Sequence, residues 1–400
     1  MNRYTIARQP RLIAGEDSLE GLPDLLHSDG RRAPAVITGG RSIRGRDQWS
    51  RLVEALMDAG LEFLECTVRG EPSPESVDAI VADIRSDLPH CDAVVAIGGG
   101  SVIDTAKAVA AGVALPADEY GGGIVRFLEG VGDTVHPGST LPLYAVPSTA
   151  GTGSEATKNA VLSRTGAAGF KKSLRHDNFI PHTAIIDPLL QVGCPPAVTQ
   201  ASGLDAITQL LEVFVSRAAT PVTDALAREG LRRGGSALVA LMSGEESVAH
   251  RGDMALAAYF SGVGLANAGL GLVHGYASPL GARHDVPHGV VCGVLVGPVT
   301  AAVVRALAAA GEEGREGLRR YAEAAEILGV AHAGDGPVAH LAAGEALAAW
   351  LAKRAEGLGR LADYGFTAAE LPELAAASGM KNTPVALDEA TRTAILQEVL

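Results

Sequence analysis

The change in hydrophobic pattern near residue 195 is the feature that most constrains the fold of this chain. Before it, short apolar runs such as 35–38 and 92–97 alternate with helical patterns, and we interpret these runs as buried strands. After it, long Ala- and Leu-rich helical patterns take over. We therefore expect an α/β domain at residues 1–195 and an all-helical domain at residues 196–400.

The order of elements in the first part predicts a parallel sheet. Helical spacing at 49–59, 74–86 and 101–111 separates the apolar runs, and parallel strands need such crossovers, so helices should cover both faces of the sheet. Ser73 is a candidate N-cap because Pro74 stands at the first helical position after it. In the second part the predicted helices are 203–216, 220–242, 255–268, 299–310, 314–328, 337–358, 367–376 and 387–399.

Composition and charge exclude several classes of function. The chain is 47% hydrophobic and 20% charged, which is typical of a soluble globular protein. Its net charge of -13 offers no basic surplus for phosphates, so we expect no nucleic acid partner. We find neither a signal peptide nor an apolar span of about 18 residues, and we expect a cytoplasmic protein without a membrane segment. The cysteines show no CxxC pattern, so we interpret them as free thiols: Cys66, Cys91, Cys194 and Cys292.

A glycine-rich turn follows the strand at 92–97. Gly98, Gly99 and Gly100 allow a bound group to approach the backbone, and the exposed N–H groups of a helix start favour a phosphate. Ser101 is a candidate cap of that helix, with Asp104 returning a bond. The turn is neither GxGxxG nor a P-loop, and an ordinary tight turn between strand and helix remains the alternative.

A second polar loop follows the strand at 141–146. From Ser148 to Glu155, Ala150 is the one residue that is neither glycine nor an oxygen-bearing side chain. Such a loop can bind a nucleotide through hydroxyls and amides. The alternative is a solvated connector, which this composition also favours.

Two separated segments carry candidate metal ligands. Asp205 and Gln209 stand at positions i and i+4, so a helix places both side chains on one face. His274 and His288 should come from two elements that meet at a bend, because helix-breaking residues lie between them: Pro279, Gly281 and Pro287. Together these residues predict a mixed oxygen and nitrogen site for a divalent metal. The alternative is that the histidines are hydrogen-bonded core residues and Asp205 caps a helix.

Taken in order, the segments GGGSVIDTAKAVA, PSTAGTGSEAT, GLDAITQ, VHGYASPLG and PHG resemble the iron-containing, or group III metal-dependent, alcohol dehydrogenases. The resemblance runs across about residues 10–300. It implies a dinucleotide-binding α/β domain followed by an all-helical domain, with NAD(P) in the cleft and Fe²⁺ or Zn²⁺ at its floor. It also implies a homodimer or a larger homo-oligomer.

Matching positions carry the family's cofactor contacts over to this chain. The resemblance puts the pyrophosphate on the turn formed by Gly98, Gly99, Gly100 and Ser101. It puts Thr149 and Thr152 along the nicotinamide and phosphate side, and it brings Lys172 to the ribose.

The resemblance also assigns the metal ligands and shows two departures. Asp205, His274 and His288 fall on three of the family's four ligands, and the fourth, usually His, is Gln209 here. Gln209 can still offer a carbonyl oxygen, although imidazole binds Zn²⁺ or Fe²⁺ better. Many relatives have a proton-relaying His where this chain has Ser278, which cannot take up a proton near neutral pH.

The turn after the second strand bears on cofactor choice. NAD-preferring relatives tend to have Asp there, whereas this chain has Gly39, Gly40, Arg41 and Ser42. Glycines leave room, and basic or hydroxyl groups suit a 2′-phosphate, so we expect NADP in preference to NAD. The alternative is that Arg41 and Arg44 are solvated loop charges.

The expected activity is reversible hydride transfer between NAD(P)H and a small aldehyde or ketone, with the corresponding alcohol in the reverse direction. His274, His288 and Ser278 are the candidate catalytic residues, the histidines through the metal and Ser278 in a hydroxyl chain for the proton. Three alternatives remain. They are a metal-independent reductase similar to maleylacetate reductases, a lyase of the dehydroquinate synthase type, and a nucleotide-binding relative without catalysis.

Overall fold

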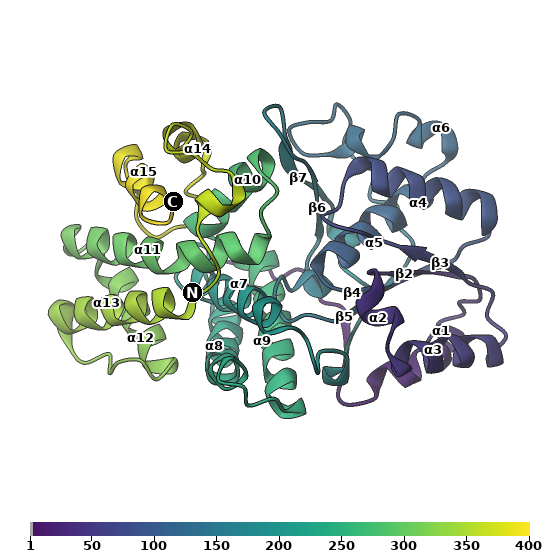
Figure 1. The fold of residues 1–400 in the computed structure, drawn as a ribbon, viewed down its shortest axis with the longest axis horizontal. Coiled ribbons are helices and arrows are strands. Elements are labelled where there is room, and N and C mark those ends of the chain that lie inside the picture. Colours follow the sequence, from purple (N-terminus) through teal and green to yellow (C-terminus); the bar gives the residue numbers. More distant parts are fainter. Residues whose placement is uncertain (1–2) are drawn as a thin grey trace.

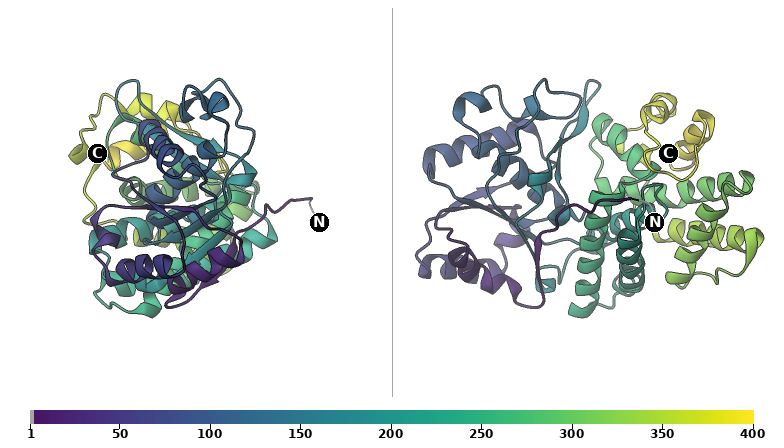
Figure 2. Two further views of the ribbon diagram at one scale, coloured as in Figure 1. Left: turned by 90° about the vertical axis from the view of Figure 1, so that its right-hand side faces the viewer. Right: turned by 180° about the vertical axis from the view of Figure 1, so that it is seen from behind.

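The structure is a computed structural model that describes residues 3–400, with the side chain of Arg41 left out. Figure 1 shows a sheet with flanking helices at one end of the molecule and a purely helical part at the other, and Figure 2 shows the same two parts from behind. This arrangement confirms the predicted fold class: a parallel sheet in the N-terminal part and helices in the C-terminal part.

The sheet has six strands, and every pairing between neighbours is parallel. Their order across the sheet is β1 (Arg11–Ala14), β8 (Thr183–Ile186), β5 (Leu143–Pro147), β4 (Ala93–Gly98), β2 (Pro34–Thr38) and β3 (Leu64–Thr67). In a parallel sheet all strands end at one edge, so the turns after β2, β4 and β5 lie beside one another there.

Both faces of the sheet are buried, which explains why its central strands are apolar at every position. Along β4, Val94 and Ala96 pack toward one layer of helices, whereas Val95 and Ile97 pack toward the other. The second layer holds α1 (Leu22–Ser28) and α3 (Asp47–Asp58), and the first holds α4 (Pro74–Asp87) and α5 (Gly100–Val113). The predicted cap of α4 is confirmed, since the Ser73 side chain accepts a hydrogen bond from the backbone N–H of Ser76.

An antiparallel hairpin that the sequence reading did not predict lies between the two parts of the molecule. It consists of β6 (Asn159–Arg164) and β7 (Phe170–Arg175), and it contacts α5 on one side and α10 (Leu272–Arg283) on the other. The shorter elements of this part are α2 (Arg41–Arg44), α6 (Ala117–Tyr120), η1 (Ser18–Gly21), η2 (Ile124–Phe127), η3 (Ser154–Ala156), η4 (Asp177–Phe179) and η5 (Pro188–Leu190).

From residue 196 onward the chain is helical. Besides α10, this part contains α7 (Pro196–Phe214), α8 (Pro221–Met242), α9 (Val248–Ala268), α11 (His288–Ala309), α12 (Arg315–Ile327), α13 (Gly336–Arg354), η6 (Leu361–Tyr364), α14 (Leu371–Ala377) and α15 (Glu389–Glu398). The helix predicted at 299–310 is longer than expected, because it starts at His288.

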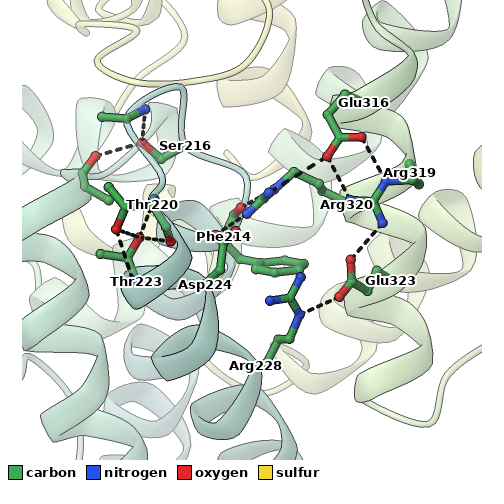
Figure 3. Close-up of polar contacts among 12 residues, drawn as sticks. Phe214, Ser216, Thr220, Thr223, Asp224, Arg228, Glu316, Arg319, Arg320 and Glu323 are labelled. Atoms are coloured by element: carbon green, nitrogen blue, oxygen red, sulfur yellow. Dashed lines mark hydrogen bonds and ion pairs between the residues drawn. The ribbon is translucent and has the colours of Figure 1, made fainter. Parts of the chain in front are cut away.

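The carboxyl end of α7 is tied to two other helices (Figure 3). The Arg320 Nε of α12 donates to the Phe214 carbonyl oxygen at 2.6 Å, and the same guanidinium pairs with Asp224 of α8. The guanidinium carbons of Arg228 and Arg320 lie 5.0 and 4.6 Å from the centre of the Phe214 ring. These contacts fix the end of the helix that carries Asp205.

Helix α11 corrects one expectation from the sequence. With a mean hydropathy of 2.1 it is long and apolar enough to cross a membrane, so the expected absence of such a span was wrong. However, 72% of its apolar window is buried inside the protein, and its Val and Leu side chains form part of the main core of the helical part. Burial on all sides explains the composition without a membrane.

Candidate metal centre and nucleotide cleft

A cavity of about 620 Å³ lies between the sheet part and the helical part. The sheet part contributes Gly100, Ser101 and Thr152 to its wall, and the helical part contributes residues of α7, α10 and α11, namely Gln209, His274, Ser278 and His288. Part of the predicted phosphate turn and three of the four predicted metal ligands therefore face one cavity, and Asp205 lies behind its wall, next to both histidines.

Three helices bring the metal-ligand candidates together. Asp205 lies in the middle of α7, His274 lies in the first turn of α10, and His288 is the first residue of α11. The two histidines thus come from two elements, as predicted. The break between those elements falls at 284–287, whereas Pro279 and Gly281, which were expected to interrupt the helix, lie inside α10.

The donor atoms of this cluster are close to one another. The Asp205 Oδ1 lies 3.2 Å from the His274 Nε2 and 3.6 Å from the His288 Nε2. A fourth donor, the Cys292 Sγ, lies 3.6 Å from the first of these nitrogens and 3.7 Å from the second. All four donor atoms lie within 4.8 Å of one another.

A buried carboxylate orients one of the imidazoles. The Glu212 Oε2 lies 2.7 Å from the His274 Nδ1, and the Glu212 Oε1 accepts the backbone N–H of Val273 at 2.7 Å. A carboxylate on one ring nitrogen leaves the other nitrogen to a metal, which is the arrangement found around protein zinc sites. The sequence reading did not identify Glu212.

The charges in the cluster suit a divalent cation. Burial raises the pKa of Asp205, but the nearby imidazoles outweigh this effect and lower the pKa to about 2. Burial lowers the pKa of His288 to about 4, and the attraction of Asp205 offsets only part of that. Near neutral pH the first residue is therefore ionised and the second is neutral, which are the states that bind a metal. Burial lowers the pKa of His274, but Cys292, Asp205 and Glu212 outweigh this effect and raise that pKa, so a metal at the His274 Nε2 would replace a proton. The residues present fit the metal that the fold implies.

The fourth position of the cluster differs from the expectation. The Gln209 Nε2 lies 3.5 Å from the Gly151 carbonyl oxygen, and the Gln209 Oε1 lies 3.5 Å from the Ser261 hydroxyl. Cys292, which the sequence reading treated only as a free thiol, lies among the donor atoms. Its spacing from His288 on one helix face, i and i+4, was a signal that could have identified it.

The glycine turn begins α5 without the cap that was predicted. Gly98 ends β4, Gly99 is the N-cap residue, and no side chain caps the helix, so the expected role of Ser101 was wrong. Asp104 is engaged elsewhere, because its carboxylate accepts the Ser154 hydroxyl at 2.9 Å and a backbone N–H of β6 at 2.9 Å. The first N–H groups of α5 are left without side-chain partners, as a phosphate site requires.

The two polar turns touch each other at positions where a side chain would not fit. A Cβ on Gly99 would lie 3.1 Å from the Thr149 Oγ1, and a Cβ on Gly100 would lie 2.6 Å from the Thr152 Oγ1. Of the two threonines, Thr152 lines the main cavity, whereas Thr149 lines a smaller cavity beside it. The glycines therefore let the backbones of the two turns approach closely.

The structure brings Lys171, and not Lys172, into the cleft. Side chains alternate along β7, so Lys171 and Ser173 line the cavity while Lys172 is exposed on the other side. The Lys171 side chain is 9% exposed and pairs with Glu71 at 3.2 Å. The assignment from the resemblance was one residue away from the lysine that faces the cavity.

The turn after β2 lies beside the glycine turn, since Thr38 is in register with Ile97 of β4. Gly39, Gly40 and Ser42 stand in that turn and in α2, outside the wall of the main cavity, and the side chain of Arg41 lies outside the described part of the structure. The Arg44 Nε donates to the Thr38 hydroxyl at 2.9 Å, and its Nη1 pairs with Glu65 at 2.9 Å. Arg44 is therefore not a free solvated charge.

Ser278 lines the cavity, but its hydroxyl donates to the Lys171 carbonyl oxygen at 2.8 Å. This bond joins α10 to the hairpin. His284, the C-cap residue of the helix α10, lies with its Nε2 3.2 Å from Glu370 and its ring against Phe366, outside the cavity wall, so it is not placed to transfer a proton there.

A buried cluster of charged and polar groups joins α5 to the residues that follow the second polar turn. The Lys107 Nζ donates to the Thr157 hydroxyl at 2.7 Å and to the Asn159 carbonyl oxygen at 2.9 Å, and it lies 3.4 Å from Asp104. Burial raises the pKa of the neighbouring Glu155 to about 7. These groups hold the turn against α5, and the sequence reading assigned none of them a role.

Comparison with known proteins gives consistent matches over both parts of the chain. Residues 9–188 match the family described as iron-containing alcohol dehydrogenase, and residues 199–400 match the C-terminal part of the Fe-containing alcohol dehydrogenase family. Alcohol dehydrogenase 4 of Saccharomyces cerevisiae is 39% identical over 296 residues, which cover 72% of each protein.

For two further similar proteins, the match covers different shares of their length. Probable alcohol dehydrogenase EutG of Salmonella typhimurium is 40% identical over 220 residues, so this chain spans about half of its length, 53%. The solved structure of a 1,3-propanediol oxidoreductase is 26% identical, and it superposes with a TM-score of 0.84 over 100% of both chains.

Proposed function

Because the chain belongs to the iron-containing alcohol dehydrogenase family, we propose that it is a metal-dependent, NAD(P)-linked alcohol dehydrogenase that also reduces aldehydes. Its substrates are small alcohols and the corresponding carbonyl compounds. The observation that carries this proposal is the cluster of Asp205, His274 and His288 at the wall of a cavity that the glycine turn also lines.

Each group in the cavity has a separate task in this proposal. The bound metal supplies Lewis-acid polarisation of the substrate oxygen, and the nicotinamide supplies or accepts the hydride. Asp205, His274 and His288 hold the metal at the cavity wall, and Glu212 keeps the first imidazole in the correct orientation. The N–H groups at the start of α5 bind the pyrophosphate, close to Thr152.

Proton transfer requires a group other than the histidine that many relatives use. The Ser278 hydroxyl donates to the Lys171 carbonyl oxygen, and its oxygen can accept a bond from an alcohol in the cavity. In this proposal the Ser278 hydroxyl first turns its hydrogen away from the Lys171 carbonyl oxygen, which cannot relay a proton. It then accepts the alcohol proton while passing its own to a chain of hydroxyls that leads to solvent, and it does not store the proton.

The proposed cofactor is NADP in preference to NAD. Gly39 leaves no carboxylate directly after β2, and Ser42 follows within the same turn. Arg44 contributes less than its charge suggests, because Glu65 already neutralises it. A comparison of kcat/KM for NADPH and NADH tests this choice.

Several broader properties accompany the proposed function. We propose two domains, residues 1–195 and 196–400, with the cofactor and substrate between them. The free thiols of all four cysteines support a reducing compartment such as the cytoplasm. A homodimer or larger homo-oligomer is proposed on the family resemblance, and light scattering of the purified protein tests it.

The decisive experiment measures metal content and then turnover. Purified protein is analysed for bound iron and zinc, and a panel of small alcohols and aldehydes is assayed with both cofactors. We expect about one metal per chain and activity that requires it. Full turnover without metal would instead favour a metal-independent reductase, an alternative that the orientation of the Gln209 amide away from the cluster supports.

A further inference from the structure

We propose that Cys292 is the fourth protein ligand of the metal, so that this chain holds a thiolate-containing site formed by Asp205, His274, His288 and Cys292. This inference rests on the proposed function, because it concerns the same metal. It assigns Gln209 a different role, as a residue of the cavity wall.

The distances within the cluster match a tetrahedron of ligands. Zinc binds nitrogen and oxygen at about 2.0–2.2 Å and sulfur at about 2.3 Å, so tetrahedral ligand atoms lie about 3.3–3.6 Å apart. The distances from the Asp205 Oδ1 to the two imidazole nitrogens are 3.2 and 3.6 Å. Those from the Cys292 Sγ to the same nitrogens are 3.6 and 3.7 Å. These four of the six separations are close to the required values before any ion is added, and the other two are at most 4.8 Å.

The helices explain why Cys292 reaches the site. His288 and Cys292 lie one turn apart on α11, so their side chains project from the same face. Cys292 is fully buried at 0% exposure, and its sulfur lies beside the nitrogens of the two imidazoles. The Cys292 side chain belongs to the apolar core of the helical part, but its sulfur lies beside the two imidazole nitrogens, and a ligand role accounts for that direction.

Gln209 fits the fourth position less well. Its amide nitrogen and oxygen face Gly151 and Ser261, each at 3.5 Å, so the side chain spans from α7 to the second polar turn and to α9. Its side chain also lines the main cavity. In this assignment Gln209 is a wall residue near the substrate and nicotinamide.

A thiolate changes which metal the site selects. Imidazole, carboxylate and thiolate together form a set that suits Zn²⁺, while a set without sulfur is less selective against Fe²⁺. Binding is balanced by the release of the Cys292 proton to solvent as the sulfur becomes a thiolate. With four protein ligands, a substrate oxygen would have to add as a further ligand, and zinc in catalytic sites sometimes undergoes such an expansion. We therefore expect a zinc enzyme.

The test uses Co²⁺ as a spectroscopic probe in the full-length protein. A cobalt–thiolate bond gives a charge-transfer band in the near ultraviolet. We expect this band in the unmodified protein, its loss in Cys292→Ser, and its persistence in Gln209→Ala and in Cys66→Ser. The last variant is a matched control, since Cys66 is also buried but lies in β3 of the sheet part.

A second measurement needs no variant and so remains valid if Cys292→Ser does not fold. X-ray absorption at the zinc edge of the unmodified zinc-loaded protein should contain one sulfur neighbour at about 2.3 Å. A metal site with only nitrogen and oxygen neighbours and no charge-transfer band would overturn the assignment while leaving the proposed function intact. A protein that binds no metal, yet turns over, would overturn both. A band that survives Cys292→Ser would also reject this ligand.

Discussion

Glu212 touches no substrate, yet at the scale of single residues it determines how well the metal is held. The Glu212 Oε2 lies 2.7 Å from the His274 Nδ1, and this contact fixes the orientation of the imidazole ring. Replacing Glu212 with Gln keeps the size but weakens this bond, and changes of this kind typically reduce metal affinity about 10–100-fold. Competition with a chelator measures the affinity. Glu370→Gln is the matched control, because that carboxylate faces His284 outside the cavity.

The burial of Glu155 leads to a prediction about how the free energy of unfolding depends on pH. Burial raises the pKa of Glu155 from its ordinary value of 4.5 to about 7, so the folded protein binds this proton more tightly than the unfolded chain. Its contribution to stability is therefore complete below about pH 4.5 and is lost as pH rises through about 7. Glu155→Gln cannot ionise and should escape this loss. Relative to the parent, the variant should gain on the order of 2 kcal/mol in free energy of unfolding between about pH 5 and pH 8.

Urea unfolding of the parent and the Glu155→Gln variant across this range provides the measurement. A constant difference between the two proteins at every pH would show that Glu155 titrates normally in the folded state.

Gly39 tests the cofactor proposal at a single position. A Cβ there would lie 3.6 Å from Val102, an ordinary contact, so Gly39→Asp should fold. The new carboxylate repels a 2′-phosphate and can bind a ribose 2′-hydroxyl, so the ratio of kcat/KM for NADPH to that for NADH should fall by about tenfold or more. Gly40→Ala is the control, since nothing lies within 4 Å of its Cβ position. An unchanged ratio would show that the 2′-phosphate of NADP binds away from this turn.

At the scale of elements, the close contact between the two polar turns leads to a prediction about stability and cofactor affinity. A Cβ on Gly100 would lie 2.6 Å from the Thr152 Oγ1, so Gly100→Ala should push the turns apart and cost about 1–3 kcal/mol of stability. Affinity for the dinucleotide, measured by calorimetry, should fall as well. Adding Thr152→Ala should recover part of both losses, whereas additive losses would argue that the turns act independently.

The elements themselves were predictable to different degrees. The apolar runs at Ala93–Gly98 and Leu143–Pro147 are strands because both faces are buried, and such runs are visible in a sequence. The hairpin Asn159–Arg175 was missed, since its strands carry charged residues and one face lines a cavity. The helix α10 was expected to break at Pro279, but the packing of Tyr276 and Leu280 into the core outweighs the lost hydrogen bond.

The residues of the metal site were also only partly predictable from the sequence. Asp205, His274 and His288 could be predicted from their segments, because each segment resembles a family motif. The role of Glu212 depends on how three helices approach one another, and no local pattern contains that information. For Cys292 the local signal is its i, i+4 spacing from His288, but its distance to the His274 nitrogen also depends on how the helices meet. The same holds for Lys171, whose direction depends on the register of a hairpin that the sequence reading did not contain.

At the scale of the whole molecule, the cavity exists because two differently built parts meet. The sheet part presents the edge where its strands end, as open α/β sheets do with their ligands. The helical part brings three helices to that edge, and the network around Arg320 fixes α7, the helix that carries Asp205 and Glu212. Neither part holds the nucleotide turn and the metal cluster by itself, so the activity belongs to the complete chain.

One measurement tests this account most directly: turnover of an aldehyde with NADPH or NADH before chelation, after chelation, and after return of about one equivalent of zinc or iron. We predict activity in the purified protein, its loss on removal of the metal, and its recovery when the metal is returned. His274→Ala should remain inactive and metal-poor throughout, because it removes a ligand at the centre of the cluster. Full turnover by the metal-free protein, or by His274→Ala, would contradict the account.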